Sequence, residues 1–485
     1  MSLISEQLPL RFGLLEALHQ THSADGWLSP EAVTRISREL RIPVAEAWEA
    51  ATSYPDFAFQ RAVPALRVCT GLSCLLAGAQ VPADGTGTGC QFRCYDAPAP
   101  GEDAPFPEES IRLPGPLTAP DITENAGLAA VRAMAQPEAL SRIRQSGLRG
   151  RGGAYFPVAA KWSAALDQGR PVALVVNAEE GEPGVFKDRA ILGRRPRRFL
   201  EGLAIAIEVL RPEVTVIFLH GEARGAHESL TRAIADWDDP TFSGVHIVRG
   251  GGGYVLGEET TLLNALEGRK PVPRTRPPYP VEAGLFGMPT VVNNVETLTN
   301  LSVLFRGGVE AFRAAGTEDA PGTKLLSVSG RVRLPGIYEV PLGASLAQVI
   351  EQAGGAVDGD VTAVLVGGPS GGFLPPALLD VALVPGLLHP TGAVTGSGGI
   401  VVLDSTSDIR RAALEMAEFN ARESCGKCTP CREGAPRAAE ALAAGDHSAL
   451  PDLLDALQFG SLCGLGQMAP GPIRSALTFW PELFQ

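Results

Sequence analysis

A glycine-rich loop near residue 150 is the first stretch whose composition suggests chemistry. It reads GLRGRGGAYFP, and because Gly150, Gly152 and Gly153 lack Cβ atoms, backbone N–H groups there can approach a flat or phosphorylated ligand closely. Lys161 follows the loop and adds a positive charge. A lone glycine loop is often a plain surface turn. The segments that follow the loop are needed to distinguish a ligand-binding loop from a surface turn.

An acidic turn comes after the next predicted strand. Residues 171–176 are apolar and rich in valine, which predicts a buried strand. The chain continues as NAEEGEPGVFKDR from Asn177, and its carboxylates belong to Glu179, Glu180 and Glu182. Open α/β sheets bind ligands at the ends of their strands. Carboxylates repel phosphate but accept hydrogen bonds from sugar hydroxyls and carboxamides, so we expect the glycine loop and other backbone amides to take the phosphate.

Two later segments extend the same pattern. Residues 250–268 read GGGGYVLGEETTLLNALEG and predict a helix that begins near Glu258, preceded by Gly257 and followed by Glu259. Residues 289–298 read PTVVNNVETL, and the side-chain amides of Asn293 and Asn294 suit polar ring edges or phosphate. Helical and strand patterns alternate between residues 198 and 248, which implies a parallel sheet covered by helices.

The eight cysteines form two compact groups, which in a chain without a secretory signal indicates metal ligation and not disulfides. In the second group, three thiolates spaced two residues apart can hold three irons of a cubane cluster, and a distant fourth can close it. Four thiolates also satisfy the tetrahedral geometry of zinc. The members of this group are Cys425, Cys428, Cys431 and Cys463.

These motifs, in this order, resemble the NADH-oxidising flavoprotein subunit of respiratory complex I, the diaphorase subunits of NAD-linked hydrogenases and the β subunits of NAD-dependent formate dehydrogenases. The resemblance runs from about Ala139 to the C-terminus and includes ESCGKCTPCREG, which matches the family's [4Fe–4S] motif and favours the cluster over zinc. It implies FMN, NAD(H) and a [4Fe–4S] cluster as cofactors, and no general base, because the protein only has to stack two rings and exclude water.

The resemblance also assigns residues. It implies that FMN is bound by Gly150, Gly152, Lys161, Asn177, Glu179, Glu180, Gly257, Glu258, Asn293 and Asn294. It implies that NAD is contacted by Gly153, Phe156, Glu182, Glu259, Arg276 and Tyr279. Three departures alter the expected geometry: Glu179 replaces an aspartate, Ala164 stands near an expected aromatic residue, and Arg276 and Tyr279 replace a lysine and a phenylalanine.

The N-terminal region resembles the thioredoxin-like [2Fe–2S] subunit that partners the flavoprotein in the same enzymes. Helices are predicted up to about residue 53, with Ser29 as a cap and Pro30 in the first helical position. The pairs Cys69/Cys74 and Cys90/Cys94 keep the spacing of that family, but only 15 residues separate the two pairs. We therefore expect a shortened relative, whose four cysteines either hold a [2Fe–2S] cluster or are free or structural.

Composition limits the remaining possibilities. The chain has 485 residues, too many for one core, with 45% hydrophobic and 20% charged residues. A net charge of −13 argues against nucleic-acid binding. The N-terminus carries no secretory signal pattern, and the longest uncharged span, residues 381–403, is broken by proline and glycine, so we expect a cytoplasmic protein without membrane insertion.

We expect an α/β multidomain fold in four parts. Residues 1–112 form a helical plus truncated thioredoxin-like region, 113–321 a Rossmann-like FMN- and NAD-binding domain, 322–405 a β-grasp (ubiquitin-like) domain, and 406–485 a C-terminal helical bundle that binds [4Fe–4S]. The proline-rich residues 97–120 predict a linker.

The predicted function is NADH:acceptor oxidoreductase (diaphorase) activity in the β subunit of a NAD-dependent formate dehydrogenase. Expected partners are a thioredoxin-like [2Fe–2S] subunit and a molybdenum-containing, formate-oxidising iron–sulfur subunit. A hydrogenase diaphorase or a complex I-type subunit would perform the same half-reaction with another partner. A flavin-free electron-transfer scaffold is the alternative from a different class.

Overall fold

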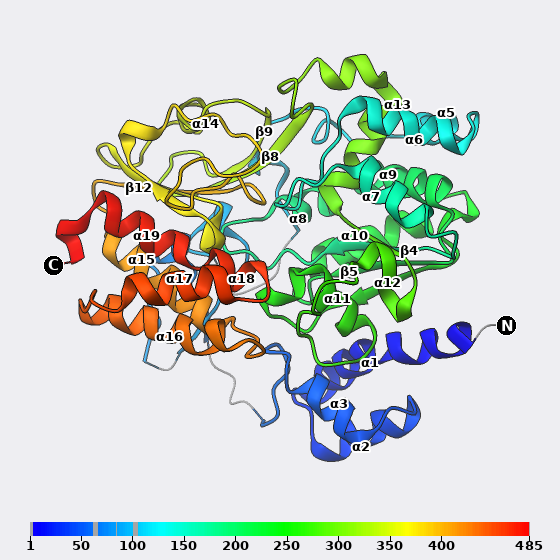
Figure 1. Cartoon of the computed structure of the whole chain (residues 1–485), viewed down its shortest axis with the longest axis horizontal. Coiled ribbons are helices and arrows are strands. Elements are labelled where there is room, and N and C mark those ends of the chain that lie inside the picture. Colours follow the sequence, from blue (N-terminus) through cyan, green and yellow to red (C-terminus); the bar gives the residue numbers. More distant parts are fainter. Residues whose placement is uncertain (1–2, 62–65, 84, 100–104, 485) are drawn as a thin grey trace.

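The flavoprotein-like part of the chain is built on a parallel sheet. The computed structural model describes residues 3–61, 66–83, 85–99 and 105–484. Four strands, all parallel, lie in the order β6-β5-β4-β7 (Figure 1). Their bounds are β4 Ala173–Ala178, β5 Val214–Leu219, β6 Val245–Arg249 and β7 Thr290–Asn294. The predicted strands and their parallel arrangement are confirmed.

Both faces of this sheet are covered. Alternate residues of a strand point to opposite faces, so Leu174 and Val176 pack into one core while Ala173 and Val175 pack into the other. Helices of the same domain fill the first core, chiefly α8 (Lys187–Arg194), α9 (Pro196–Leu210), α10 (Arg224–Ala235) and α13 (Val295–Arg313). The helices α5 (Ala126–Arg132), α6 (Gln136–Ser146) and α7 (Val158–Leu166) precede β4.

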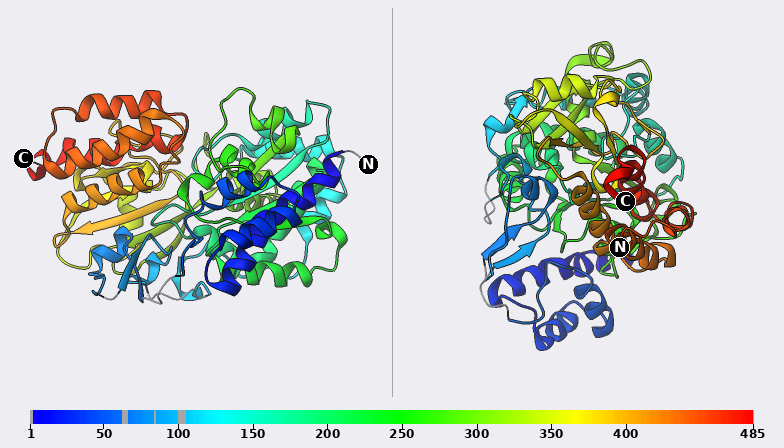
Figure 2. Two further views of the ribbon diagram at one scale, coloured as in Figure 1. Left: turned by 90° about the horizontal axis from the view of Figure 1, so that it is seen from below. Right: turned by 90° about the vertical axis from the view of Figure 1, so that its left-hand side faces the viewer.

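The second face is covered largely by the N-terminal helices. These are α1 (Leu3–Asp25), α2 (Pro30–Glu39) and α3 (Val44–Ala51), and their apolar residues share one core with α11 (Glu259–Leu266) and the sheet. Figure 2 shows α1 lying along this part of the molecule. The Ser29 hydroxyl accepts a hydrogen bond from the N–H of Ala32 at 3.1 Å, which confirms the predicted cap. The N-terminal helices therefore belong to the core of the nucleotide-binding sheet.

The rest of the N-terminal region is small, as its shortened sequence predicts. The parallel strands β1 (Leu66–Cys69) and β2 (Gly85–Thr88) pair with each other, and α4 (Leu72–Leu76) lies between them in the chain. A 3-10 turn at Cys94–Asp96 follows β2. Short helical segments of the nucleotide-binding domain include α12 (Pro280–Ala283) and the 3-10 turns at Pro240–Phe242, Tyr254–Gly257 and Leu285–Gly287.

The predicted β-grasp region is a six-stranded mixed sheet in the order β11-β10-β12-β8-β9-β3, with α14 (Leu346–Gln352) beside it. Its sequential strands are β8 Thr323–Gly330, β9 Gly336–Pro341, β10 Val361–Val366, β11 Gly372–Leu374 and β12 Gly399–Asp404. The sixth strand comes from outside the predicted domain: β3 (Ile111–Leu113) pairs in parallel with β9.

The prediction of a linker at residues 97–120 is wrong for its last part. Besides β3, Leu117 and Thr118 are 0% and 1% exposed. The buried carboxylate of Glu339 accepts hydrogen bonds from the backbone N–H groups of Leu117 and Thr118, the closest of each at 3.0 Å, and from the Thr118 and Thr323 hydroxyls at 2.8 and 2.6 Å. A proline-rich composition did not reveal this, because the partner groups lie more than 200 residues away in sequence.

The C-terminal region is helical, as predicted. It contains α15 (Ile409–Arg422), α16 (Thr429–Ala444), α17 (Leu450–Gly460), α18 (Gly464–Met468) and α19 (Pro470–Phe479), which stand next to the β-grasp sheet in Figure 1. Among the described residues, no helix is both long and apolar enough to cross a membrane. The four domain boundaries proposed from the sequence stay predictions.

Replacing Glu339 tests the attachment of residues 111–118. Glu339→Ala leaves the buried backbone N–H of Leu117 and the hydroxyls of Thr118 and Thr323 without their acceptor, whereas the Thr118 N–H keeps the Gly115 carbonyl at 3.1 Å. Each buried donor without an acceptor costs roughly 1–3 kcal/mol. We expect the free energy of unfolding to fall by about 3 kcal/mol in chemical denaturation. Glu351→Ala, an exposed glutamate of the same region, is the control and should change it by less than about 0.5 kcal/mol. Equal stability of both variants would contradict this role of Glu339.

Candidate functional site

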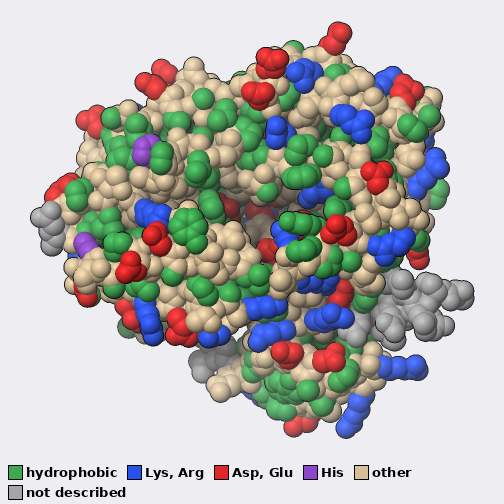
Figure 3. Space-filling view, viewed as in Figure 1, with side chains coloured by type: hydrophobic (Ala, Val, Ile, Leu, Met, Phe, Trp, Pro, Cys, Tyr) green, Lys and Arg blue, Asp and Glu red, His purple; other side chains and the backbone are tan. Residues whose placement is uncertain are grey.

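The candidate site is a cavity of ≈ 430 Å³ at the carboxyl edge of the parallel sheet. The chain runs from β4 to β5 and β6 on one side, while β7 lies on the other side of β4. Strand order therefore reverses at β4, which is where open α/β sheets bind ligands. Figure 3 shows the molecule hollowed near the middle of this face, with acidic side chains inside the hollow. The nucleotide-binding domain, the β-grasp region and the C-terminal helical region all line the cavity, for example through Gly152, Ser397 and Cys463 respectively.

The glycine loop forms one wall, with its backbone close to neighbouring segments. An added Cβ on Gly152 would lie 3.1 Å from the Cβ of Asn294, and Gly153 has φ +117°, a conformation that favours glycine. The loop is held from behind by Arg151, 0% exposed, whose guanidinium donates to the carbonyls of Thr323 at 3.0 Å and Pro321 at 2.7 Å. The cavity is thus bounded on this side by glycine backbone, which a planar ring could approach closely.

Two of the predicted carboxylates have separate partners. Glu180 accepts hydrogen bonds from the backbone N–H groups of Asp188 at 2.7 Å and Arg189 at 3.1 Å, at the start of α8. Glu182 accepts from the hydroxyl of Ser397 at 2.8 Å, and its other oxygen has no partner among the described residues. Burial raises the pKa of Glu182 to about 7. Glu182 can therefore be a hydrogen-bond donor near neutral pH.

Glu179 is the most isolated of the three. Its side chain is 0% exposed, and neither carboxylate oxygen has a hydrogen-bond partner in the described part of the chain. Burial, followed by the nearby carboxyl of Asp56, raises its pKa well above the usual range. The Nε2 atom of His220 lies 3.5 Å from one oxygen, and burial lowers the pKa of this imidazole well below its usual value. Both groups are therefore expected to be neutral.

A buried lysine lies beside these acids, and sequence reasoning did not assign it a role. The Nζ atom of Lys187 lies 2.7 Å from Asp188, 3.2 Å from Glu296 and 3.2 Å from the side-chain oxygen of Asn294. Burial opposes the ammonium, but the carboxylates of Asp188, Glu296 and Glu180 together raise its pKa. Lys187 and Asp188 both line the cavity. The sequence signal that could have identified Lys187 was the KDR at the end of the acidic motif.

The structure brings most of the predicted FMN residues together. Nine predicted site residues line the cavity: Gly152, Gly153, Asn177, Glu179, Glu180, Glu182, Gly257, Glu258 and Asn294. Asn177 and Asn294 also hold the protein together, because the Asn177 amide donates to the carbonyl of Gly257 at 2.8 Å and the Asn294 amide to Asp188 at 2.6 Å. Neither Gly150 nor Asn293 is among the lining residues. Gly150 closes the loop by donating to the carbonyl of Phe156 at 2.9 Å, and Asn293 accepts a bond from the indole of Trp162 at 2.8 Å.

The remaining predicted residues form a charged group with two exposed rings. Glu259 lies 3.5 Å from Lys161 and 3.0 Å from Arg276, and Arg276 also pairs with Glu258 at 2.5 Å. Phe156 and Tyr279 are 54% and 51% exposed, unusual values for large aromatic side chains. Glu258 lines the cavity at the sheet edge, whereas Phe156, Lys161, Glu259, Arg276 and Tyr279 do not. The two rings are open to solvent.

The four C-terminal cysteines surround a small cavity of their own. Cys428 ends the loop before α16, Cys431 lies in its first turn, Cys463 precedes α18, and Cys425 lines the same hollow. Within the described residues, no three His, Cys, Asp or Glu side chains gather as a single metal ion requires. The structure thus places all four predicted thiol ligands around one hollow. Val255, Cys463 and Leu465 line both this hollow and the flavin cavity.

The N-terminal cysteines also converge. The Sγ atoms of Cys90 and Cys94 are 3.5 Å apart, and the backbone N–H groups of Gln91, Phe92 and Ala99 donate to Cys69, Cys90 and Cys74 at 3.3–3.4 Å. Backbone donors to thiolate sulfur are one of the ways in which proteins tune iron–sulfur clusters. The site fits a two-iron cluster, although the loop between the cysteine pairs is short.

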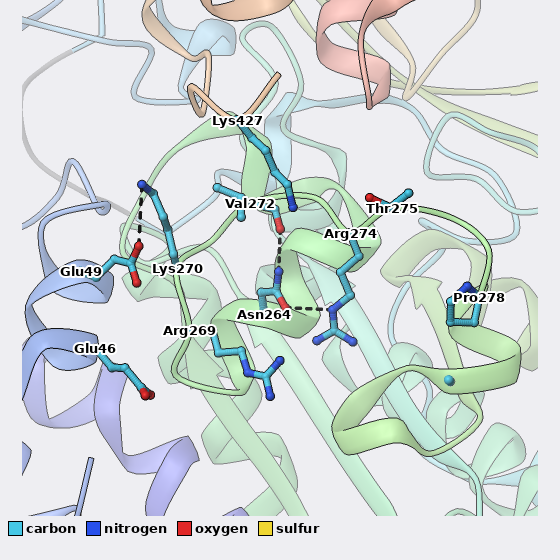
Figure 4. A pocket seen from close by; sticks show the side chains of 11 residues that line it. Glu46, Glu49, Asn264, Arg269, Lys270, Val272, Arg274, Thr275, Pro278 and Lys427 are labelled. Atoms are coloured by element: carbon cyan, nitrogen blue, oxygen red, sulfur yellow. Dashed lines mark hydrogen bonds and ion pairs between the residues drawn. The ribbon is translucent and has the colours of Figure 1, made fainter. Parts of the chain in front are cut away.

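A larger cavity, ≈ 750 Å³, lies between α3 and the chain from Asn264 to Ala283 (Figure 4). Its cations are already engaged: Lys270 lies 4.0 Å from Glu49, Arg274 donates to Asn264 at 2.8 Å, and Lys427 donates to the carbonyl of Pro273 at 2.7 Å. No predicted binding residue lines it within the described part of the chain. Nine of the predicted binding residues line the smaller cavity at the sheet edge instead.

Family models match four parts of the chain. They are the Nuo51 FMN-binding domain at residues 143–303, the NADH-ubiquinone oxidoreductase-F iron–sulfur binding region at 411–485, the thioredoxin-like [2Fe-2S] ferredoxin at 4–91 and the SLBB domain at 325–374. The site and these matches define the class: an NADH-dependent oxidoreductase subunit with FMN and iron–sulfur domains. The predicted enzyme class and the predicted cofactors are confirmed.

Known relatives then give the family. The chain is 40% identical over 362 residues, 70% of its length and 86% of the relative's, to an F-type subunit of NADH-quinone oxidoreductase from Rhizobium meliloti (strain 1021). It is 37% identical to the HndC subunit of the NADP-reducing hydrogenase of Solidesulfovibrio fructosivorans, covering 72% of this chain and 76% of that one. The chain belongs to the family of NADH-oxidising flavoprotein subunits represented by the F-type subunits of NADH-quinone oxidoreductase.

A solved structure matches nearly the whole chain. A chain of an NAD⁺-reducing [NiFe]-hydrogenase, crystallised in the air-oxidised state, superposes with a TM-score of 0.85 at 32% identity and covers 97% of this chain and 93% of its own. The same enzyme type in the H₂-reduced state gives a TM-score of 0.84. This protein is therefore a subunit of a multi-subunit NADH-oxidising complex with iron–sulfur partners.

Gly152 provides a direct test of the cavity. A valine there would meet Asn294 on one side and fill the cavity on the other, so we expect flavin content, measured by absorbance after purification, to fall at least tenfold. Gly244→Val, in the same domain and with nothing within 4 Å of its added Cβ, is the matched control and should retain flavin. Full flavin occupancy in Gly152→Val would show that the loop is not the cradle.

Proposed function

We propose that this chain passes hydride between NAD(H) and FMN in the cavity at the sheet edge and single electrons between FMN and a [4Fe–4S] cluster held by Cys425, Cys428, Cys431 and Cys463. One observation supports this above all: Val255, Cys463 and Leu465 line both the flavin cavity and the hollow between the cysteines. When bound, FMN supplies the conversion of a hydride into single electrons.

The residues of the cavity contribute position and charge. The Gly152–Gly153 backbone lets a planar ring approach, and Lys187 presents a permanent positive charge from behind the acidic turn. Glu182, with a pKa of about 7 and one unpartnered oxygen, can donate to or accept from a carboxamide. In this proposal Glu182 orients the nicotinamide, and no residue acts as a general base.

The dinucleotide tail is assigned to the charged group at the entrance. Exposed Phe156 and Tyr279 offer rings for stacking, and Glu259 offers a carboxylate for ribose hydroxyls. The absence of an aromatic residue at Ala164 makes these two rings more important for the adenine end. Asn293 and Gly150 act, in this proposal, by supporting strand β7 and the loop and not by touching the ligand.

The N-terminal cysteines are proposed to hold a [2Fe–2S] cluster. All four are close together in space, and three receive backbone hydrogen bonds. The matching family model ends at residue 91, so Cys94 is supported by geometry alone. Iron near six per chain in the purified protein would support both clusters, and a value near four would leave this group without one.

The partner that supplies or takes electrons is the finer question. The β subunit of a formate dehydrogenase was the assignment from the sequence, and it stays a prediction. Coverage of 97% of this chain by a subunit of an NAD⁺-reducing [NiFe]-hydrogenase, N-terminal region included, favours a hydrogenase diaphorase as a second candidate. Purifying the native complex and measuring NAD⁺ reduction with formate and with hydrogen separates the two. A flavin-free scaffold would show no flavin absorbance in the same preparation.

Cluster ligation can be separated from hydride transfer. Cys463→Ala removes one ligand, so electron flow from NADH to the partner subunits should collapse, at least a hundredfold, while NADH oxidation by an artificial acceptor that takes electrons from flavin changes less than about threefold. Cys463→Ser is the conservative variant. If Cys463→Ala passes electrons to the partner at the wild-type rate, Cys463 does not ligate the cluster.

Nucleotide choice should depend on Glu259. NADP carries a 2′-phosphate that this carboxylate would repel, and Glu259→Gln would also release Lys161 and Arg276 to attract it. We expect kcat/KM for NADPH relative to NADH to rise by a factor equivalent to about 1–3 kcal/mol. Glu228→Gln, an exposed glutamate on α10 of the same domain, serves as the control. An unchanged ratio with flavin still bound would place the ribose elsewhere.

A further inference from the structure

The N-terminal region inserts a carboxyl group behind the flavin cavity. After α3, the chain crosses the Gly250–Gly253 loop, and the N–H of Asp56 donates to the carbonyl of Gly251 at 3.0 Å. The fit is tight: an added Cβ on Gly251 would lie 2.6 Å from Tyr54, and one on Gly252 would lie 2.3 Å from Asp56. Asp56 is therefore fixed against the loop that follows strand β6.

Asp56 and Glu179 lie against two neighbouring glycines, Gly221 and Gly250. Added Cβ atoms on Gly221 and Gly250 would lie 3.1 Å from Asp56 Oδ2 and 2.8 Å from Glu179 Oε2. The added Cβ on Gly221 would also lie 2.2 Å from the carbonyl oxygen of Gly250, so the backbones of the two glycines are in close contact. Asp56 Oδ2 and both Glu179 oxygens are buried and have no hydrogen-bond partner among the described residues. Two unpaired buried carboxylates beside the same backbone repel each other, and the charge of Asp56 is, after burial, the largest cause that raises the pKa of Glu179.

From this geometry we propose that Asp56 is a positioning residue that acts through Glu179: the two carboxyl groups hold one proton at rest and take up a second when the cavity's cofactor is reduced. The inference rests on the proposed function, since it assumes that FMN binds in the cavity that Glu179 lines. FMN in this cavity would accept one hydride from NADH, which would leave as NAD⁺, and the cofactor would then carry one more negative charge. One proton from solvent on the Asp56 carboxylate would balance that charge.

The charges around Asp56 and Glu179 favour proton uptake by these two carboxyl groups. Burial first, then Glu222 and Glu423, raise the pKa of Asp56 to about 7, while Arg67 lowers it. Glu179 faces Asp56, Glu180 and Glu423, which raise its pKa, and Arg189, which lowers it. His220 cannot supply the proton, because its Nδ1 accepts from the N–H of Glu222 at 3.2 Å and burial keeps it neutral. The Arg67–Glu222 ion pair, 3.1 Å apart, reaches solvent, and both of its charges act on Asp56.

Linkage between proton binding and reduction sets the direction in which the flavin reduction potential changes with pH. A group that binds its proton more tightly in the reduced state makes the flavin potential fall with pH between its two pKa values. Since the pKa of Asp56 is about 7 before reduction, the added slope should appear above about pH 7. The measurement is a redox titration of bound flavin at several pH values in the purified complex.

We expect Asp56→Asn to lose the added slope, Asp56→Glu to restore it, and Glu49→Gln, an exposed carboxyl change on α3, to leave it as in the wild type. A purely structural role would instead lower the melting temperature and flavin content of Asp56→Asn without changing the slope, and would overturn the proposal. Wild-type protein that binds no flavin would contradict the proposed function, and not this inference alone.

Infrared difference spectra keep the test decisive if Asp56→Asn does not fold. Reducing the wild-type complex should create a protonated-carboxyl band that shifts in deuterated water and moves in Asp56→Glu. A wild-type spectrum without such a band on reduction, or a band that Asp56→Glu leaves in place, overturns the proposal.

Discussion

A fully buried network of two lysines and a glutamate is the interaction on which the site depends. The ammonium of Lys324, on β8, lies 2.5 Å from Glu296 at the start of α13, and Lys187 lies 3.2 Å from the same carboxylate. Lys324 also donates to the carbonyls of Ser397 at 2.8 Å and Arg151 at 3.3 Å. One side chain of the β-grasp sheet thus fixes the glycine loop and the residue that binds Glu182. Such a network specifies geometry more than it adds stability, but breaking one partner would leave an unpaired buried charge, which costs about 3–5 kcal/mol.

The N-terminal region is bound to the nucleotide-binding domain in the same integral way. Its helices share a core with strands β4 and β5, and Tyr54 and Asp56 lie against the Gly251–Gly252 backbone. Further along, Phe92, between Cys90 and Cys94, packs on His220 with ring centroids 4.8 Å apart and receives the guanidinium of Arg189 at 4.1 Å. A region that looks like a separate subunit in sequence is therefore one structural unit with the flavin site.

The sequence was sufficient for features set by local chemistry. Valine-rich runs predicted the parallel strands, and Ser29 and Pro30 predicted a helix start. The spacing of Cys425, Cys428 and Cys431 grouped thiols that the structure places around one hollow. It did not reveal strand β3 or the lysine network, because β3 is three residues long and Lys324 looks like any strand lysine until Glu296 is seen beside it. Asn293 and Asn294 show the same limit: adjacent strand residues point to opposite faces, so only one of the two lines the cavity.

The charge balance of the cavity explains how so many acids can be buried together. Glu180, Asp188 and Glu296 each lie beside a cation, namely Arg189, Lys187 and Lys324, at 3.2, 2.7 and 2.5 Å. Glu179 and Glu182 have no such partner, and burial raises the pKa of both. With these two protonated, the charges of Glu180, Asp188 and Glu296 are balanced by those of the three cations beside them. Any negative charge that a bound group gains on reduction is then uncompensated, and protonation of a nearby carboxylate costs less than bringing in another cation.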